Sequence, residues 1–141
     1  MALAIALKTA SATGQAIVDR SQDCIRVYFT VTPSGSYAAG GDPLDLSLLN
    51  TALASGGPGG APIPSGSLPI IVRLRSAALA SVAQTNMFEY NYAPGTTLAN
   101  GKMQLFTGAA AQTALTEFTA GSYPAGVLAD AIVGEAVFPA M

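Results

Sequence analysis

Glycine and proline are spread so densely along this chain that few stretches could hold a helix. Together, 15 glycines and 9 prolines divide the 141 residues into short segments rich in β-branched and aromatic side chains. Both residues interrupt helices, because proline lacks a backbone N–H and glycine leaves the backbone unrestricted. Short β-forming segments between turn signals are typical of an all-β domain.

The segment Cys24–Thr32 has the clearest strand pattern, since every second residue from Ile25 to Val31 is apolar. A period of two places these residues on one face of a strand, where they can pack into a core. The same alternation predicts strands at Pro69–Arg75 and Met87–Tyr92. Further strand candidates are Lys102–Thr107 and Ala131–Phe138 and, with a less regular pattern, Leu44–Leu48 and Ala2–Leu7.

The dipeptide Asn100-Gly101 predicts a hairpin. Both central positions of a two-residue type I′ turn need a positive φ, which asparagine and glycine adopt most easily. Such a turn would join a strand through Thr97–Ala99 to the strand Lys102–Thr107.

Other segments predict links rather than strands. Pro33–Asp42 is rich in turn residues, and Ser55–Gly66 has almost no side chain able to pack a core, so we expect a flexible loop there. Helix-compatible composition occurs only at Leu44–Ala54 and Ser76–Gln84. The first of these could form a short helix, or a strand followed by a turn.

These patterns predict an all-β fold with little helix and long Gly/Pro-rich loops. We expect an antiparallel β-sandwich of jelly-roll-like type, with an antiparallel barrel as the alternative. Residues 1–141 are enough for one domain that buries about two-thirds of its unfolded surface. Within it, residues 1–9 are a possible terminal arm and residues 55–66 a flexible loop.

The residue types needed for most enzyme and metal chemistry are missing. Histidine is absent and Cys24 is the only cysteine. A Ser-His-Asp triad therefore lacks its imidazole, and a structural zinc site lacks its several Cys or His ligands. A Ser-Lys dyad would need Lys8 or Lys102, which are better interpreted as solvated charges at strand ends. We expect no enzymatic activity, no metal and no cofactor.

Nucleic-acid and membrane partners are not expected either. The six basic residues are scattered and the net charge is −2, so there is no basic stripe for a nucleic acid. The apolar stretch Leu68–Ala83 contains Pro69 and two arginines, whereas a membrane span needs about 20 apolar residues. Ala2–Leu7 lacks the preceding basic segment of a signal peptide.

Carboxylates and tyrosines are the remaining candidates for a site. Asp42 and Asp45 could ligate calcium or act as a catalytic pair, but an aspartate before proline is also a common turn residue. Phe88, Tyr90 and Tyr92 form an aromatic stripe that could stack on sugar rings. We favour a structural role for the two aspartates and core or interface packing for the stripe.

The scarcity of charge favours a structural, partner-covered protein. Half of the residues are hydrophobic and only 10% are charged, against about a quarter in average proteins. Monomers usually limit exposed apolar patches, so such a chain is expected to be covered by other protein. Arg73 and Arg75 share one strand face and are candidates for partner contacts, although a solvated face is the main alternative. The apolar ends of the chain supply the other candidate contacts: Ala2, Leu3, Ile5, Leu7, Val137 and Phe138.

Three segments resemble the small cement, or decoration, proteins of tailed-bacteriophage heads: Val27–Leu48, Glu89–Thr107 and Ala120–Ile132. In that family a strand leads into a glycine-rich link and then a G-x-x-L-D-L segment, here Gly41–Leu46. A tyrosine-bearing strand, an ANGK hairpin at Ala99–Lys102 and a YPAG turn at Tyr123–Gly126 follow in the same order.

The resemblance implies a jelly-roll-like subunit on the outer surface of a virion head, made in the cytoplasm of the bacterial host. Its partner would be the major capsid protein, whose subunits it would bridge and stabilise. Proteins of this family are dimers or trimers at capsid symmetry axes, and a homodimer is expected here, with a trimer as the alternative. The Ser55–Gly66 insertion departs from the family pattern. The alternative function is a carbohydrate-binding β-sandwich module of a phage fibre or spike, using Tyr90, Tyr92 and Asp42.

Overall fold

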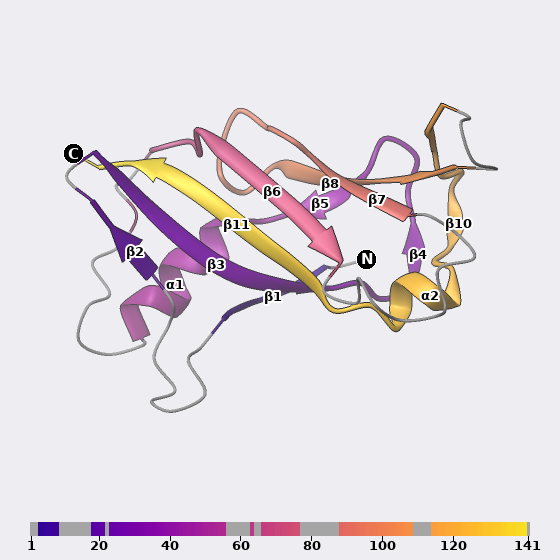
Figure 1. Ribbon diagram of the computed structural model, residues 1–141, viewed down its shortest axis with the longest axis horizontal. Helices are drawn as coiled ribbons and strands as arrows, with labels where there is room; N and C mark the ends of the chain where they lie inside the picture. Colours follow the sequence, from indigo (N-terminus) through magenta and orange to yellow (C-terminus); the bar gives the residue numbers. More distant parts are fainter. Residues whose placement is uncertain are drawn as a thin grey trace.

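The structure is a computed structural model that describes residues 3–8, 18–21, 23–55, 63, 66–76, 88–108 and 114–140. It confirms an all-β fold in which antiparallel sheets pack face to face as a sandwich around one apolar core. Figure 1 shows three of its longest strands, β3, β11 and β6, side by side. The jelly-roll connectivity expected from the resemblance stays a prediction.

The first sheet has five strands in which the last strand of the chain lies in the middle. Its order is β1-β3-β11-β6, and β2 pairs with β3 beyond the end of β1. All pairings are antiparallel. The strands are β1 (Ala4–Leu7), β2 (Val18–Arg20), β3 (Cys24–Thr32), β6 (Ile71–Ser76) and β11 (Ile132–Pro139).

The second sheet is centred on β8, which pairs with β7 on one side and with the short strands β5 and β9 on the other. A separate two-stranded ribbon joins β4 to β10. The strands are β4 (Ser36–Tyr37), β5 (Asp42–Leu44), β7 (Phe88–Ala93), β8 (Gly101–Thr107), β9 (Thr116–Glu117) and β10 (Gly121–Ser122).

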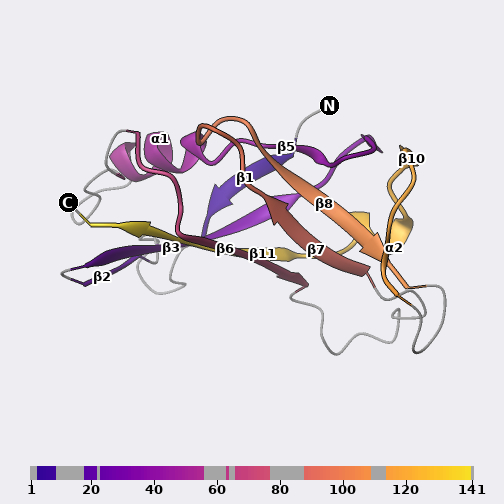
Figure 2. The same ribbon diagram turned by 90° about the horizontal axis from the view of Figure 1, so that it is seen from above.

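Among the described residues, two short helices lie at opposite ends of the sandwich, α1 (Ser47–Ser55) and α2 (Ala125–Leu128). In Figure 2, α1 lies at the end that holds the C-terminus, and α2 lies at the end that holds β10. Leu49 and Leu53 of α1 are buried in the core, so this helix closes one end of the sandwich. The expected strand at Leu44–Leu48 is therefore wrong beyond Leu44, because the chain turns into α1.

The alternation that predicted strands is confirmed by burial. Along β3 every second residue from Ile25 to Val31 is buried, and its neighbours are half-buried or exposed. In β6, Val72 and Leu74 pack against the core while the arginines between and after them are exposed. Buried side chains of β3 and β11 on one sheet, and of β5, β7 and β8 on the other, fill the interior.

The predicted hairpin exists, but its turn differs from the expectation. β7 pairs with β8 from Phe88 to Ala93, so the loop runs through 94–100 and Thr97–Ala99 is not a strand. The Asn100 side chain accepts a hydrogen bond from the Thr97 backbone N–H (2.8 Å) and closes this longer loop. Gly101 is a residue of β8, where a Cβ atom would overlap the ring of Tyr92. Glycine is needed there for ring packing rather than for a type I′ turn.

A second close approach explains a glycine in the middle of β11. Gly134 pairs with Phe29 of β3, and a Cβ atom at Gly134 would overlap the Phe29 ring. The ring covers the glycine, and this contact fills the core between two long strands.

Several sequence predictions lie outside the described residues. These are most of the Ser55–Gly66 loop, the helix-compatible stretch after Ser76, and both ends of the possible arm 1–9. Of that arm, residues 4–7 form β1 at the edge of the first sheet. In the described part of the chain, no helix has the length and apolarity needed to cross a bilayer.

Candidate protein-binding face

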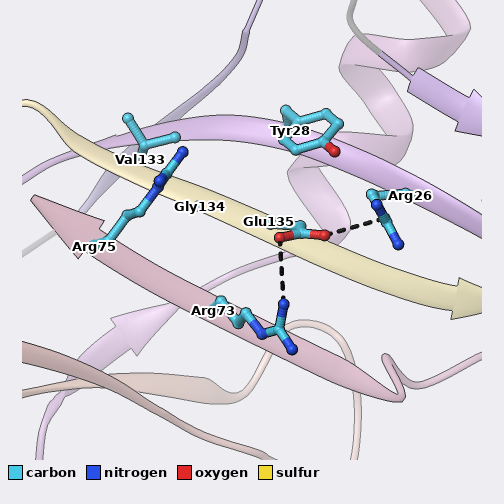
Figure 3. Close-up of a pocket in the computed structure, with 7 residues that line it drawn as sticks. All are labelled: Arg26, Tyr28, Arg73, Arg75, Val133, Gly134 and Glu135. Atoms are coloured by element: carbon cyan, nitrogen blue, oxygen red, sulfur yellow. Dashed lines mark ion pairs between the residues drawn. The ribbon is translucent and has the colours of Figure 1, made fainter. Parts of the chain in front are cut away.

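The outer surface of the first sheet gathers three of the chain's four arginines. We call this surface the arginine face and define it by residues of β3, β6 and β11: Arg26, Tyr28, Arg73, Arg75, Val133 and Glu135. Together with the backbone at Gly134 they line an open hollow of about 350 Å³. Figure 3 shows their side chains on the same side of the three strands.

Strand register places these side chains in rows across the sheet. Glu135 of β11 lies between Tyr28 of β3 and Arg73 of β6. In the neighbouring row Val133 lies between Thr30 and Arg75. Arg73 therefore has the carboxylate of Glu135 as its neighbour on β11, whereas Arg75 has the apolar Val133.

One carboxylate serves two guanidinium groups on this face. Oε1 of Glu135 lies 3.0 Å from Nε of Arg26, and Oε2 lies 4.0 Å from Nη1 of Arg73. Figure 3 shows Glu135 between these two arginines, with Arg75 beside Val133. Within the described part of the chain, Arg75 has no ion pair. The face therefore has more guanidinium groups than carboxylates to pair with them.

The two pairs differ in how firmly they hold their arginine. The Arg26 side chain is 42% exposed, and its pKa is raised by a hydrogen bond with Tyr28 and then by the charges of Tyr28, Glu135 and Asp19. The Arg73 side chain is 70% exposed and touches Glu135 only at the limit of an ion pair. An exposed pair of this kind contributes about 0–1 kcal/mol, so Arg73 is readily available to a partner.

Apolar side chains continue the face beyond its charged rows. Ile71 pairs with Val137 across β6 and β11 and is 43% exposed. Ile70 and Leu68, which precede β6 in the chain, are also exposed (63% and 42%). Arginines beside exposed aliphatic side chains have the composition of protein-binding surfaces.

The terminal residues proposed as partner contacts lie mostly in the chain's own core. Leu3 and Phe138 are buried, and Ile5 and Leu7 are half-buried and pack against the core. Since β11 is hydrogen-bonded on both sides, the C-terminal segment is no free edge either. Ala2 lies outside the described residues. Val137, half-buried beside Ile71, and the two arginines on β6 remain on the accessible outer surface.

A second polar group of residues is built around three buried tyrosines, with one buried carboxylate, Asp42, and two half-buried ones, Glu117 and Asp130. We call it the tyrosine cluster; in it, three tyrosine hydroxyls donate hydrogen bonds to three carboxylates. Tyr37 donates to Glu117 (2.7 Å), Tyr90 to Asp130 (2.8 Å), and Tyr123 to Asp42. Backbone or hydroxyl groups supply a second donor to each carboxylate: Gly40 to Glu117, Ser76 to Asp130 and Ala38 to Asp42.

The tyrosine cluster raises the pKa of its phenols. Burial, followed by the hydrogen bond to Glu117, raises the pKa of Tyr37 to about 12. Burial raises the pKa of Tyr90 and Tyr123 still further, reinforced by Asp130 and Asp42 respectively. The rings also contact one another, with Tyr37 edge-on to Tyr123 at a centroid distance of 5.8 Å. These groups act as buried hydrogen-bond donors and hold the second sheet to β4 and the segment around α2.

This packing decides between the two interpretations of the aromatic stripe and of the aspartate pair. Phe88, Tyr90 and Tyr92 all face inward, so the stripe is core packing. Asp42 is 1% exposed, whereas Asp45 accepts a hydrogen bond from the backbone N–H of Ser47 (2.9 Å) at the start of α1. The two aspartates have separate structural partners, but Asp42 is a buried residue of β5 rather than the turn residue that its position before proline predicted.

Sequence reasoning found Arg73 and Arg75 but missed Arg26, Tyr28 and Glu135. Strand alternation could have placed Arg26 and Tyr28 opposite the apolar face of Cys24–Thr32. The position of β11 between β3 and β6 carries no local sequence signal, and only this neighbour relation brings Glu135 between the arginines.

Comparisons with protein-family models, curated proteins and solved structures found no match. The geometry of the arginine face and the sequence resemblance are therefore the observations that bear on function.

Proposed function

We propose that this protein is a structural virion protein that decorates the outer surface of a tailed-phage head. It binds the major capsid protein, bridges neighbouring subunits and stabilises the assembled lattice. One observation carries most of the proposal: an open sheet face on which an exposed isoleucine, Ile71, adjoins arginines that lack a full set of carboxylate partners. The turn motifs from Gly41–Leu46 to Tyr123–Gly126 support the choice of partner.

The mechanism is binding rather than chemistry. A protein that binds only the assembled lattice stabilises that lattice by mass action, in proportion to the logarithm of its free concentration over Kd. If each protomer contacts two capsid subunits, or if two protomers associate as the expected homodimer, the effective concentration at the second contact rises. Dissociation of the head then requires several contacts to break together.

The carbohydrate-binding alternative loses the residues on which it relied. Tyr90 is 6% exposed and donates its hydroxyl to Asp130, while Asp42 is committed to Tyr123 and Ala38. Tyr92 packs against the core. None of the three offers a ring or a carboxylate to a sugar, so we propose the decoration function alone.

The test is direct binding to undecorated heads, assembled from the major capsid protein encoded in the same genome. We expect the purified full chain to cosediment with the heads at a fixed, saturable stoichiometry and to raise their disruption temperature. Binding to unassembled capsid protein alone should be weaker, because the bridged subunits are then absent. Failure to bind assembled heads, or binding with no change in disruption temperature, would contradict the proposal.

A further inference from the structure

The rows of the arginine face differ in how their charges are balanced. Across β2, β3, β11 and β6 the outward charged residues are three arginines, Glu135, and Asp19 opposite Arg26. Glu135 and Asp19 both lie next to Arg26. The excess positive charge is therefore at the β6 edge, where Arg73 has a 4.0 Å contact and Arg75 has no ion pair within the described residues.

The spacing of these two arginines selects the shape of a ligand. Arg73 and Arg75 are two residues apart on one strand, so their Cα atoms lie about 7 Å apart. Two carboxylates on an extended chain have the same spacing when one residue separates them. Ile71, the exposed outward residue next to Arg73 on β6, offers apolar contact to the stems of such side chains, and the largely covered Val133 lines the hollow beside Arg75.

We infer that the β6 edge of the arginine face binds an extended acidic segment of a protein partner, with acidic residues two apart that pair with Arg73 and Arg75. This inference rests on the proposed function only for the identity of that partner, an acidic stretch exposed on the capsid lattice. On binding, the partner's carboxylate competes with Glu135 for Arg73, while Glu135 keeps its 3.0 Å pair with Arg26.

The same charges explain why a carboxylate segment is favoured over phosphates. Guanidinium groups form bidentate pairs with either anion. A phosphodiester chain carries a negative charge on every nucleotide and so cannot leave out a charge where it passes Glu135. A protein segment can carry carboxylates beside the two arginines and neutral residues elsewhere. Its neutral residues can face the apolar part of the surface.

The test uses the full ¹⁵N-labelled chain without any capsid. The probes are a capped Glu-Thr-Glu-Thr-Glu peptide, the matched Gln-Thr-Gln-Thr-Gln peptide and inorganic phosphate. We expect the glutamate peptide alone to shift backbone amides of β6 and β11 in a saturable, salt-sensitive way. Arg75→Gln should weaken this binding about fivefold, as expected for one exposed ion pair. Lys102→Gln removes the same charge from the other sheet and should leave binding unchanged.

Each other outcome overturns the inference. An equal response to the glutamine peptide would show that charge is not recognised. Equal shifts with phosphate would indicate a general anion site, and shifts that persist unchanged in Arg75→Gln would place the peptide elsewhere. No shifts up to the solubility limit of the glutamate peptide would exclude binding. Because no heads are present in this titration, a negative result would overturn the inference about the acidic segment. It would not bear on whether the protein binds heads.

Discussion

The tyrosine cluster and the arginine face both combine carboxylates with hydrogen-bond donors, yet they use them in opposite ways. In the tyrosine cluster each of three carboxylates accepts two hydrogen bonds, one of them from a buried tyrosine. On the outer face one carboxylate divides its two oxygens between two arginines, and a third arginine has no ion pair among the described residues.

The difference follows from the physics of burial. A buried polar group without a partner costs about 1–3 kcal/mol, so an interior cluster must be complete in the folded chain. An exposed guanidinium is solvated by water and can stay unpaired at little cost. Incomplete pairing is therefore tolerated only where water can reach the unpaired group. The fully paired cluster is structural, and the incompletely paired face is the one available for binding.

The largest expected effect is on the tyrosine cluster. Asp42→Ala removes the acceptor of the Tyr123 hydroxyl and the Ala38 N–H, and Asp42 is 1% exposed. Leaving both donors unsatisfied should lower the free energy of unfolding by about 3 kcal/mol. Urea denaturation measures this, with Glu89→Ala as the control because Glu89 is exposed on β7. If both variants lost the same free energy of unfolding, the buried Asp42 would contribute no more to stability than the exposed Glu89.

Alkaline pH should act on the same cluster. An unfolded chain ionises its tyrosines near pH 10, whereas the pKa of Tyr37 in the folded protein is about 12. Between these values the unfolded state binds fewer protons, so the stability that Tyr37 contributes is complete below about pH 10 and is lost as pH rises through 12. Denaturant titrations at a series of pH values measure the slope. Tyr37→Phe should show a shallower decline, and a wild-type stability that stays constant through pH 11 (about one unit above the unfolded pKa) would contradict the account.

On the arginine face the expected effects are on binding. Ile71→Ser removes an aliphatic side chain that is already 43% exposed, so the free energy of unfolding should change by less than about 0.5 kcal/mol. Affinity for undecorated heads should fall about fivefold, because that surface is covered in the complex. Sedimentation binding isotherms check this. If Ile71→Ser instead lost much of its stability and kept its affinity for heads, the arginine face would be structural rather than a binding surface.

The smallest expected effect concerns the shared carboxylate. Glu135→Gln should alter stability by about 1 kcal/mol, since Arg73 is exposed and the glutamine oxygen can still accept from the buried Nε of the half-buried Arg26. It should strengthen binding of the glutamate peptide about twofold, because Arg73 no longer has an internal competitor. Titration by ¹⁵N NMR measures the change. Weaker peptide binding in this variant would mean that Glu135 orients the arginines rather than competing for them.

Local pattern was enough to predict the fold class and the three strands of the face, but not which strands are neighbours. Alternation placed Ile25 to Val31 inward and Arg73 and Arg75 outward, because the period of a strand depends only on neighbouring residues. Strand neighbours depend on distant packing. The chain's last strand lies between β3 and β6, and this could not be deduced from the apolar run Ala131–Phe138.

The same limit explains the corrected interface residues. Apolar residues near a terminus are expected to be buried, but the sequence does not say whether they are buried in their own core or against a partner. Here Leu3 and Phe138 are buried in the core of their own sandwich. Asn100-Gly101 similarly indicated a turn, but Gly101 belongs to β8, where the Tyr92 ring covers it.

The central claim is that the β6 edge of the arginine face contacts the capsid. Its most direct test is the occupancy of undecorated heads by Arg75→Glu beside the charge-matched Lys102→Glu, with both variants first shown to unfold like the wild type. We predict that Arg75→Glu leaves the heads largely undecorated, whereas Lys102→Glu reaches wild-type occupancy. Equal occupancy by the two variants would contradict the account.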